Sequence, residues 1–186
     1  MYMKRENYNS SVIDEESPSI NDDALNFREE ELYSEKKYVF HIGDESLSIF
    51  KFSEEPFIHP FLKACAYYMY KPLYNRLEID PPLYRKYKAD VIALNYTNDP
   101  VCWIECFERD YEKIEYICKH IHTDEFILVE ISNDIKKYIE ELKKKIHYKY
   151  HHLITVVNFV PELIYYVDPA DIYISDDWYQ IIDLVE

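Results

Sequence analysis

Two acidic residues in one predicted β-hairpin have the spacing of a site that could hold a metal ion or share a proton. Asp90 lies in the apolar run 89–94 and Glu105 in the apolar run 101–107, with turn-forming residues between the two runs. Paired residues in an antiparallel hairpin have residue numbers with a constant sum, so a turn centred just after Thr97 pairs Asp90 with Glu105. Directly opposite side chains have Cβ atoms about 4.5–5.5 Å apart on one face of the hairpin.

Two facing carboxylates require a compensating interaction. Their repulsion at about 4 Å ranges from ~1 kcal/mol in water to ~4 kcal/mol at an effective dielectric constant near 20. A divalent cation with oxygen ligands would compensate it. A nearby Lys or Arg, a protonated acid or a different hairpin register would also do so, and all of these stay open. If no cation binds, Asp90→Asn is expected to stabilise the protein slightly.

The surrounding sequence predicts the elements that would position these acids. Period-two and continuous apolar runs indicate strands, and apolar residues three and four apart indicate helices. A helix between two buried strands implies a right-handed parallel crossover, so we expect one α/β domain with a central mixed sheet. The expected elements are a hairpin over 38–52 around Gly43, a helix from Pro60 to Met69, the hairpin with both acids, a helix over 111–121, a strand over 126–131, a helix over 134–150, a strand over 153–160 and short edge strands at 172–174 and 179–185.

This succession of elements resembles the PD-(D/E)xK metal-dependent nuclease superfamily. More narrowly it is similar to the YaeQ family, and the motifs that carry the resemblance are Val-Cys-Trp-Ile-Glu at 101–105 and Asp-Tyr-Glu-Lys-Ile at 110–114. The resemblance covers residues 37–186. It implies an α/β fold with a PD-(D/E)xK restriction-endonuclease-like core, in which helices flank a central mixed sheet.

The resemblance also implies site residues. Asp90 and Glu105 match the two metal-binding acids, the backbone carbonyl of Cys106 would be the third ligand, and the metal would be Mg²⁺ or Mn²⁺. Phe107 occupies the position of the catalytic lysine. That lysine would orient the attacking water and stabilise negative charge on the phosphoryl oxygens, and phenylalanine can do neither.

Other residues could replace the missing groups. Lys113, in the first turns of the predicted helix, and Lys88, two residues before Asp90, could supply the cation. Solvated lysines are the simpler interpretation of both. A further acid of the site could come from Glu54 or Glu55, just before the first helix.

Two functional hypotheses follow. The first is a degenerate or weak member of the nuclease fold that acts by binding protein or nucleic acid. The alternative is a Mg²⁺- or Mn²⁺-dependent nuclease that hydrolyses phosphodiester bonds in DNA or RNA. The missing lysine favours the first hypothesis, and the paired acids favour the second.

Charge restricts the partners. The formal net charge of −15 opposes loose binding to nucleic acid, which depends on Lys and Arg releasing phosphate counterions. A local nucleic-acid contact could form near Arg85, Lys86 and Lys88 or along the lysine-rich helix 134–150. A protein partner could bind the acidic surface or the acidic N-terminal tail.

The tail, residues 1–36, is predicted to be disordered. Ten acidic residues against three basic ones give residues 1–35 a net charge of −7, and the segment lacks a sustained apolar period. No run of 18 apolar residues indicates a membrane span, and the four cysteines form no C-x-x-C pair. We therefore expect reduced core cysteines, no membrane contact and a cytoplasmic location.

Overall fold

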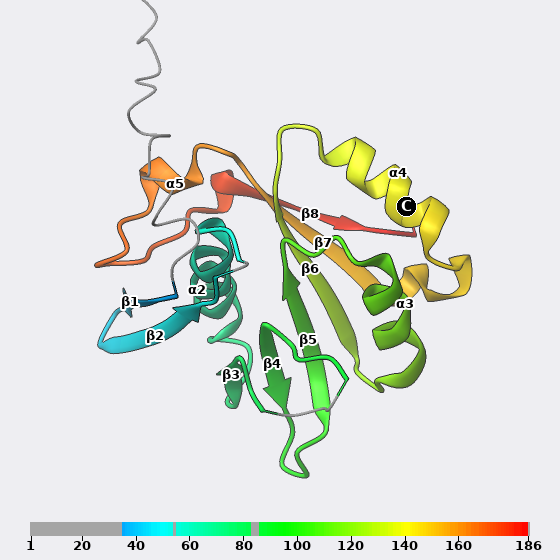
Figure 1. Ribbon diagram of the computed structural model, residues 1–186, viewed down its shortest axis with the longest axis horizontal. Coiled ribbons are helices and arrows are strands. Elements are labelled where there is room, and N and C mark those ends of the chain that lie inside the picture. The colour runs from blue at the N-terminus through cyan, green and yellow to red at the C-terminus, as the bar shows by residue number, and fades with distance from the viewer. Residues whose placement is uncertain (1–34, 54, 83–85, 186) are drawn as a thin grey trace, which may run out of the picture.

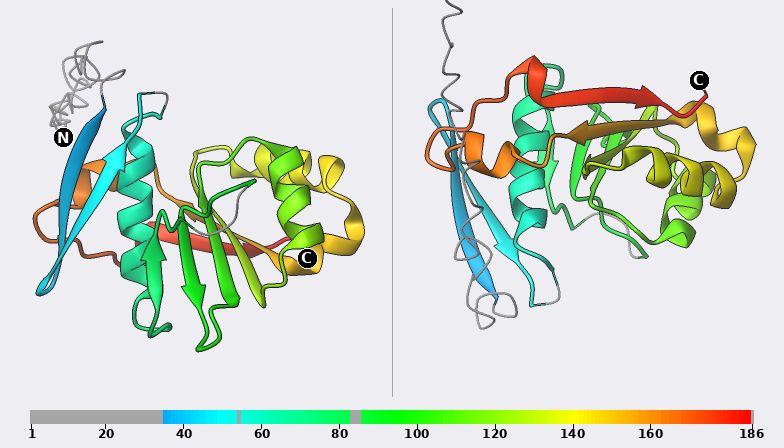
Figure 2. Two further views of the ribbon diagram at one scale, coloured as in Figure 1. Left: turned by 60° about the horizontal axis from the view of Figure 1, so that its bottom comes forward. Right: turned by 90° about the horizontal axis from the view of Figure 1, so that it is seen from above.

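The computed structural model describes residues 35–53, 55–82 and 86–185. A central six-stranded sheet separates two layers, one formed by α2 and a two-stranded hairpin and the other by α3 and α4 (Figures 1 and 2). The predicted central mixed sheet flanked by helices is thus confirmed. Most of the predicted tail, residues 1–34, lies outside the described residues, as do Glu54 and Arg85.

The large sheet has the strand order β3-β4-β5-β6-β7-β8. The two central pairs, β5 with β6 and β6 with β7, are parallel, and the pairs toward both edges are antiparallel. Each parallel pair is joined by a helix, as the apolar runs predicted. The strands are β3 (Leu77–Ile79), β4 (Val91–Leu94), β5 (Pro100–Cys106), β6 (Glu125–Ile131), β7 (Ile154–Phe159) and β8 (Tyr179–Asp183).

The register of the β4–β5 hairpin is the predicted one from Val91 to Ala93, and it shifts by one residue at Leu94, which faces Pro100. Val91 faces Ile104 and Ile92 faces Trp103, and both pairs have the sum that would bring Asp90 opposite Glu105. Asp90 itself stands one residue before β4, where the strand ladder no longer fixes the direction of its side chain.

The layer containing α3 (Tyr111–His120) and α4 (Ile135–Lys145) covers one face of the sheet. The side chain of Asp110 caps α3, because it accepts hydrogen bonds from the backbone N–H groups of Glu112 and Lys113. This cap places Lys113 in the first turn of the helix, next to the end of β5. Trp103, fully buried, packs in this core.

The opposite layer holds α2 (Ile58–Tyr70) and the hairpin of β1 (Lys36–Ile42) and β2 (Glu45–Lys51). Phe40 and Ile49 of the hairpin and Phe61 of α2 are buried together against the sheet. Gly43 forms the hairpin turn with a φ of 55°, a conformation that costs glycine little. The helix therefore lies between the hairpin and the sheet, with its N-terminal half near Asp90.

Two predicted elements require correction, and one strand was missed. The helix predicted over 134–150 ends at Lys145, because Ile146 adopts an extended conformation that buries its side chain, and a short 3₁₀ helix, η2 (Tyr148–Leu153), follows. Residues 172–174 form no strand, since Ile172 instead pairs its backbone N–H with the carbonyl of His41. Strand β3 was missed because it has only three residues, too few to show a period.

All four cysteines are buried with free thiols, as expected for core residues. Burial raises the pKa of Cys102 and Cys118 to about 12, so neither thiol is ionised near neutral pH. Within the described part of the chain, no helix has both the length and the apolar character needed to span a membrane.

Candidate functional site at Asp90 and Glu105

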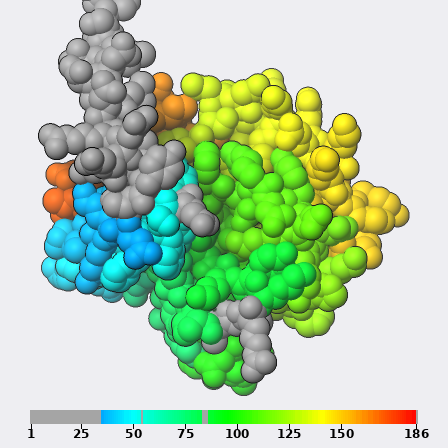
Figure 3. All heavy atoms as spheres, viewed as in Figure 1, coloured from blue at the N-terminus to red at the C-terminus, as the bar shows by residue number. Residues whose placement is uncertain are grey.

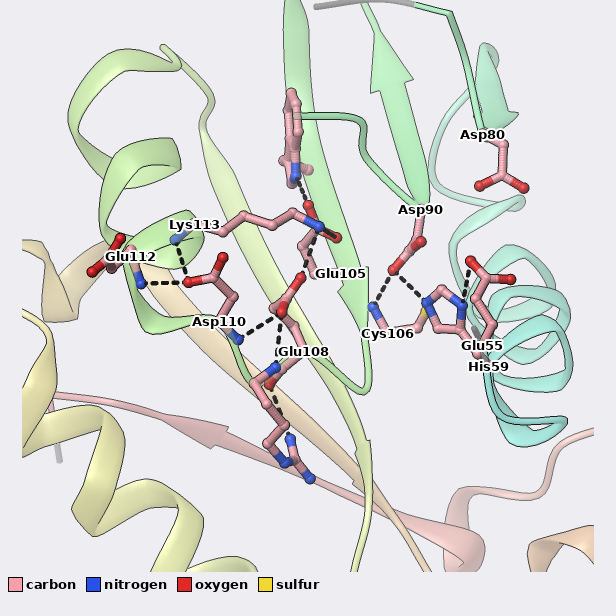
Figure 4. Close-up of polar contacts among 12 residues, drawn as sticks. Glu55, His59, Asp80, Asp90, Glu105, Cys106, Glu108, Asp110, Glu112 and Lys113 are labelled. Atoms are coloured by element: carbon pink, nitrogen blue, oxygen red, sulfur yellow. Dashed lines mark hydrogen bonds and ion pairs between the residues drawn. The ribbon is translucent and has the colours of Figure 1, made fainter. Parts of the chain in front are cut away.

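Asp90 is held by three donors just before β4, and Figure 4 shows two of them, Cys106 and His59. Its Oδ2 accepts hydrogen bonds from the backbone N–H of Cys106, at 2.7 Å, and from Nε2 of His59, at 3.0 Å. Its Oδ1 lies 3.1 Å from Nζ of Lys63. His59 and Lys63 both belong to α2, so the carboxylate is turned toward the layer of α2.

The two cations around Asp90 are shared with further acids. Nζ of Lys63 lies 2.6 Å from Oδ1 of Asp80 and 3.8 Å from Oε1 of Glu55. Nδ1 of His59 lies 3.1 Å from the same Glu55 oxygen. Lys63 is only 1% exposed, so this network is an internal one rather than a set of surface ion pairs.

The shifted pKa values of Asp90 and His59 favour the charged form of each group. Burial alone would raise the pKa of Asp90, but the hydrogen bond and charge of His59, with the charge of Lys63, hold it well below its usual range. Burial would likewise lower the pKa of His59, yet Asp90 and Glu55 outweigh it and raise that pKa to about 9. Asp90 and His59 are therefore both charged near neutral pH.

Glu105 is held by a different set of groups. Its Oε1 accepts a hydrogen bond from the indole N–H of Trp103, and its Oε2 lies against Nζ of Lys113, both at 2.7 Å. Lys113 is also 2.7 Å from Oε2 of Glu108. The Glu105 side chain is fully buried, and its burial, together with the neighbouring Asp90 charge, raises its pKa well above the usual value, an effect that Lys113 opposes.

A cleft of about 420 Å³ opens beside these groups. In Figure 3 the surface is hollowed where the cyan segment at the end of β2 meets the green segments around β5 and α3. Asp90 lines the cleft, whereas Glu105 lies beneath Lys113 and does not line it. The lining residues are Phe52, Glu55, Pro56, His59, Lys63, Asp80, Lys86, Tyr87, Lys88, Ala89, Asp90, Cys106, Phe107, Glu108 and Lys113.

Two residues on the border of this cleft have strained backbones. Phe107 has a φ of 54° and Asp80 a φ of 48°, in the left-handed region that side chains with a Cβ adopt at a cost of about 1–2 kcal/mol. Such strain persists where surrounding contacts hold it, and it gathers at functional sites. The Arg109 guanidinium stacks on the Phe107 ring, 4.6 Å from its centroid, and pairs through both nitrogens with the buried Glu130.

As arranged, the acids do not fit a metal ion. All four carboxylate oxygens of Asp90 and Glu105 already contact protein donors. Over the described ranges, no group of three or more His, Cys, Asp or Glu residues is placed to hold a metal ion. A divalent cation at these oxygens would have to displace Lys63 and Lys113 first.

The structure brings together some of the predicted site residues. Asp90 lies in one network, Glu105 and Lys113 lie in a second one beside it, Cys106 contributes its backbone N–H to Asp90, and Lys88 lines the cleft together with Lys86. The lysines of α4 lie elsewhere, and Lys145 lines a separate cavity with Arg109.

Sequence reasoning missed His59 and Lys63. Glu55, His59 and Lys63 are spaced four residues apart, which places them on one face at the start of a helix. This spacing of an acid, a histidine and a lysine was the available signal. The structure shows its role, because the Asp90 carboxylate points toward His59 and Lys63.

Comparisons with known proteins bear on the fold. The sequence matches no protein-family model and no curated protein sequence. The YaeQ protein from Pseudomonas syringae has a similar structure, with a TM-score of 0.52 and 12% identity over 81% of this chain and 89% of that one. The YaeQ protein from Xanthomonas axonopodis pv. citri matches with a TM-score of 0.49 and 15% identity over 81% and 91%. The chain has a YaeQ-like fold. At these identities the likeness concerns the fold alone.

Proposed function

We propose that this protein has a PD-(D/E)xK-like nuclease fold and that it acts by binding a partner and not by metal-dependent hydrolysis. The observation that carries the proposal is the occupation of all four oxygens of Asp90 and Glu105 by protein donors. In this interpretation His59, Lys63 and Lys113 take the electrostatic role that a metal ion would have between two acids.

Exchanging these cations for a metal ion would be costly. Lys63 is fully buried and lies between Asp90 and Asp80, so its displacement from Asp90 would take one of its two close acids from a buried ammonium. Breaking a buried pair from one side costs about 3–5 kcal/mol. Phe107 adds no cation at the position where the nuclease mechanism requires one.

The charge of the whole chain favours a protein partner. At a net charge of −15, long-range repulsion opposes approach to a phosphate backbone. Lys86 and Lys88 place positive charge at the cleft, but they stand among Glu55, Asp80 and Glu108. Such a mixed surface suits the polar rim of a protein interface better than a phosphate channel.

Thermal unfolding with Mn²⁺ or Mg²⁺ tests the proposal. A ligand bound only to the native state raises the melting temperature, because it stabilises that state by RT ln(1 + [L]/Kd). We expect millimolar metal to leave the melting temperature unchanged in the wild type and in Glu105→Gln. The Glu140→Gln variant, altered on the exposed face of α4, controls for weak metal binding to surface acids. Cleavage of DNA and RNA should be absent with either metal.

One observation supports the alternative, a Mg²⁺- or Mn²⁺-dependent nuclease. Lys113 lies 2.7 Å from Glu105 and Lys63 lies 3.1 Å from Asp90, so two lysines are available near the position that Phe107 leaves without a cation. Mn²⁺-dependent cleavage that is lost in Asp90→Asn, Glu105→Gln and Lys113→Met would establish this alternative and refute our proposal.

A further inference from the structure

The last 26 residues combine aromatic side chains with negative charge alone. Residues 161–186 contain seven acids, Glu162, Asp168, Asp171, Asp176, Asp177, Asp183 and Glu186, and no Lys, Arg or His. We call the surface formed by α5 (Leu163–Tyr166) and residues 167–180 the C-terminal face. Figure 2 shows this orange to red segment beside α2 and the hairpin.

The aromatic rings of the C-terminal face form a connected row, in which Trp178 and Tyr68 are half-buried. Trp178 lies 5.4 Å from Tyr166 and 6.2 Å from Tyr173, and Tyr173 lies 6.4 Å from Tyr68 of α2, measured between ring centroids. Tyr165, Tyr166 and Tyr173 are all more than half exposed. Tyrosine and tryptophan grouped on a surface are typical of protein interfaces, since they give large contact area at low entropic cost.

A pocket of about 320 Å³ next to this row offers hydrogen-bond acceptors. Asn158 at the end of β7 is 4% exposed, and its Oδ1 has no hydrogen-bond partner among the described residues. Its orientation is fixed, because Nδ2 donates to the carbonyl of Ser132 and a flipped amide would set two oxygens against each other. The carboxylates of Glu162 and Asp177 line the same pocket.

A guanidinium group complements this arrangement. It carries five N–H donors and no acceptor in a planar fork, and it stacks on aromatic rings. The pocket is lined by Asn158, by the acids Glu162 and Asp177 and by one aromatic residue, Tyr179, so it offers both acceptors and a ring. An unpaired buried acceptor destabilises the folded state, and a donor from a ligand would satisfy it.

We propose that the C-terminal face binds an arginine-bearing segment of a partner protein, with one guanidinium in the pocket at Asn158 and the rest of the segment along the aromatic row. Charge excludes the other occupants. A nucleic acid and a second copy of this chain are both negative, as is the N-terminal tail. Lys71, which directly follows α2 at the edge of this face, is neutralised by Glu45 at 3.4 Å. The inference rests on residues far from Asp90 in sequence, and it shares with the proposed function only the expectation of a protein partner.

Trp178 provides the measurement. Trp103, the other tryptophan, is fully buried, so a ligand at the C-terminal face should change the emission of Trp178 alone. Short peptides containing two arginines, two lysines or two citrullines would be titrated into the full-length protein. We expect saturable binding of the arginine peptide, binding at least about tenfold weaker for the lysine peptide, since an ammonium lacks the fork, and none for the citrulline peptide.

Two pairs of exposed substitutions test the location by calorimetry. We expect Glu162→Gln with Asp177→Asn, and separately Tyr166→Ala with Tyr173→Ala, to weaken the arginine peptide by at least about tenfold. The matched controls are Glu140→Gln with Asp124→Asn, and Tyr96→Ala with Tyr148→Ala, which remove the same groups from exposed positions elsewhere. The controls should bind as the wild type does.

Three results would overturn the inference. The first is that the arginine peptide does not bind. The second is an equal loss of affinity for this peptide in the test and control variants, which would indicate charge attraction without a site. The third is binding of a single-stranded oligonucleotide that is lost only in the tyrosine test variant. None of them depends on metal binding or on substitutions at Asp90, so this inference and the proposed function can fail separately.

Discussion

Asp90 and Glu105 are neighbours on adjacent chain segments, yet opposite layers of the protein hold them. Asp90 turns to His59 and Lys63 of α2, and Glu105 turns to Lys113 of α3. The surroundings shift their pKa values in opposite directions, downward for Asp90 and upward for Glu105. Two carboxylates paired by one hairpin register have thus acquired different electrostatic roles.

The difference lies in the number of cations and in access to solvent. Asp90 has two cationic partners and a backbone N–H, and it borders the cleft. Glu105 has one lysine, which it shares with Glu108, and it is fully buried. This arrangement therefore provides a permanently charged carboxylate, Asp90, at the cleft and a carboxylate that can be protonated, Glu105, beneath it.

We call Asp90 with His59 and Lys63 the Asp90 half of the site, and Glu105 with Lys113 the Glu105 half. Replacing the lysine of each half should give the largest contrast in stability between them. Lys63→Met leaves Asp90 and Asp80 without their common cation, and we expect a loss of about 3–5 kcal/mol in the free energy of unfolding. Lys113→Met should cost only about 1–2 kcal/mol, because Glu105 can take up a proton. Urea unfolding at pH 7 measures both. Equal losses would show that the two halves do not differ in the way their pKa shifts indicate.

Neutralising each acid should give a smaller contrast. Asp90→Asn removes the acceptor charge for His59 and Lys63, and we expect a loss of about 2–3 kcal/mol. Glu105→Gln should cost about 1 kcal/mol, because Glu108 still pairs with Lys113. The same urea experiment checks this order. From the sequence alone, with two facing charges and no internal cation, Asp90→Asn was expected to stabilise, and the contacts of α2 reverse that expected sign.

Much of the fold was predictable because its signals are local. The apolar runs around Asp90, Glu105 and residues 126–131 gave the strands, and the turn residues after Thr97 gave the register. The helix predicted to Tyr150 was too long because apolar spacing continues to Ile146, whereas tertiary packing ends the helix at Lys145.

The site was less predictable because its partners are distant in sequence. Lys113 is eight residues from Glu105, and the cap at Asp110 made its position predictable from local sequence. His59 and Lys63 are about 30 residues from Asp90, and no local pattern places α2 beside the start of β4. The Asn158 pocket depends on which face β7 presents and on a free amide oxygen, which only side-chain coordinates reveal.

His59 should make the Asp90 half of the site sensitive to alkaline pH. Its pKa is raised from 6.5 to about 9 in the folded state, so its contribution to stability is fully present below about pH 6.5 and is lost as pH rises through 9. Between pH 7 and pH 9 this loss amounts to about 2 kcal/mol at one pKa unit per 1.36 kcal/mol. Asp90, with its lowered pKa, stays ionised throughout this range and contributes nothing to the change.

Urea unfolding across the range should show the loss in the wild type and in His122→Gln, altered at an exposed histidine, but not in His59→Gln. A wild type and a His59→Gln variant with the same pH profile would mean that the imidazole does not carry a proton between Glu55 and Asp90. Asp90 would then have one cationic partner, Lys63, besides the backbone N–H of Cys106, and its contrast with Glu105 would be one of solvent access.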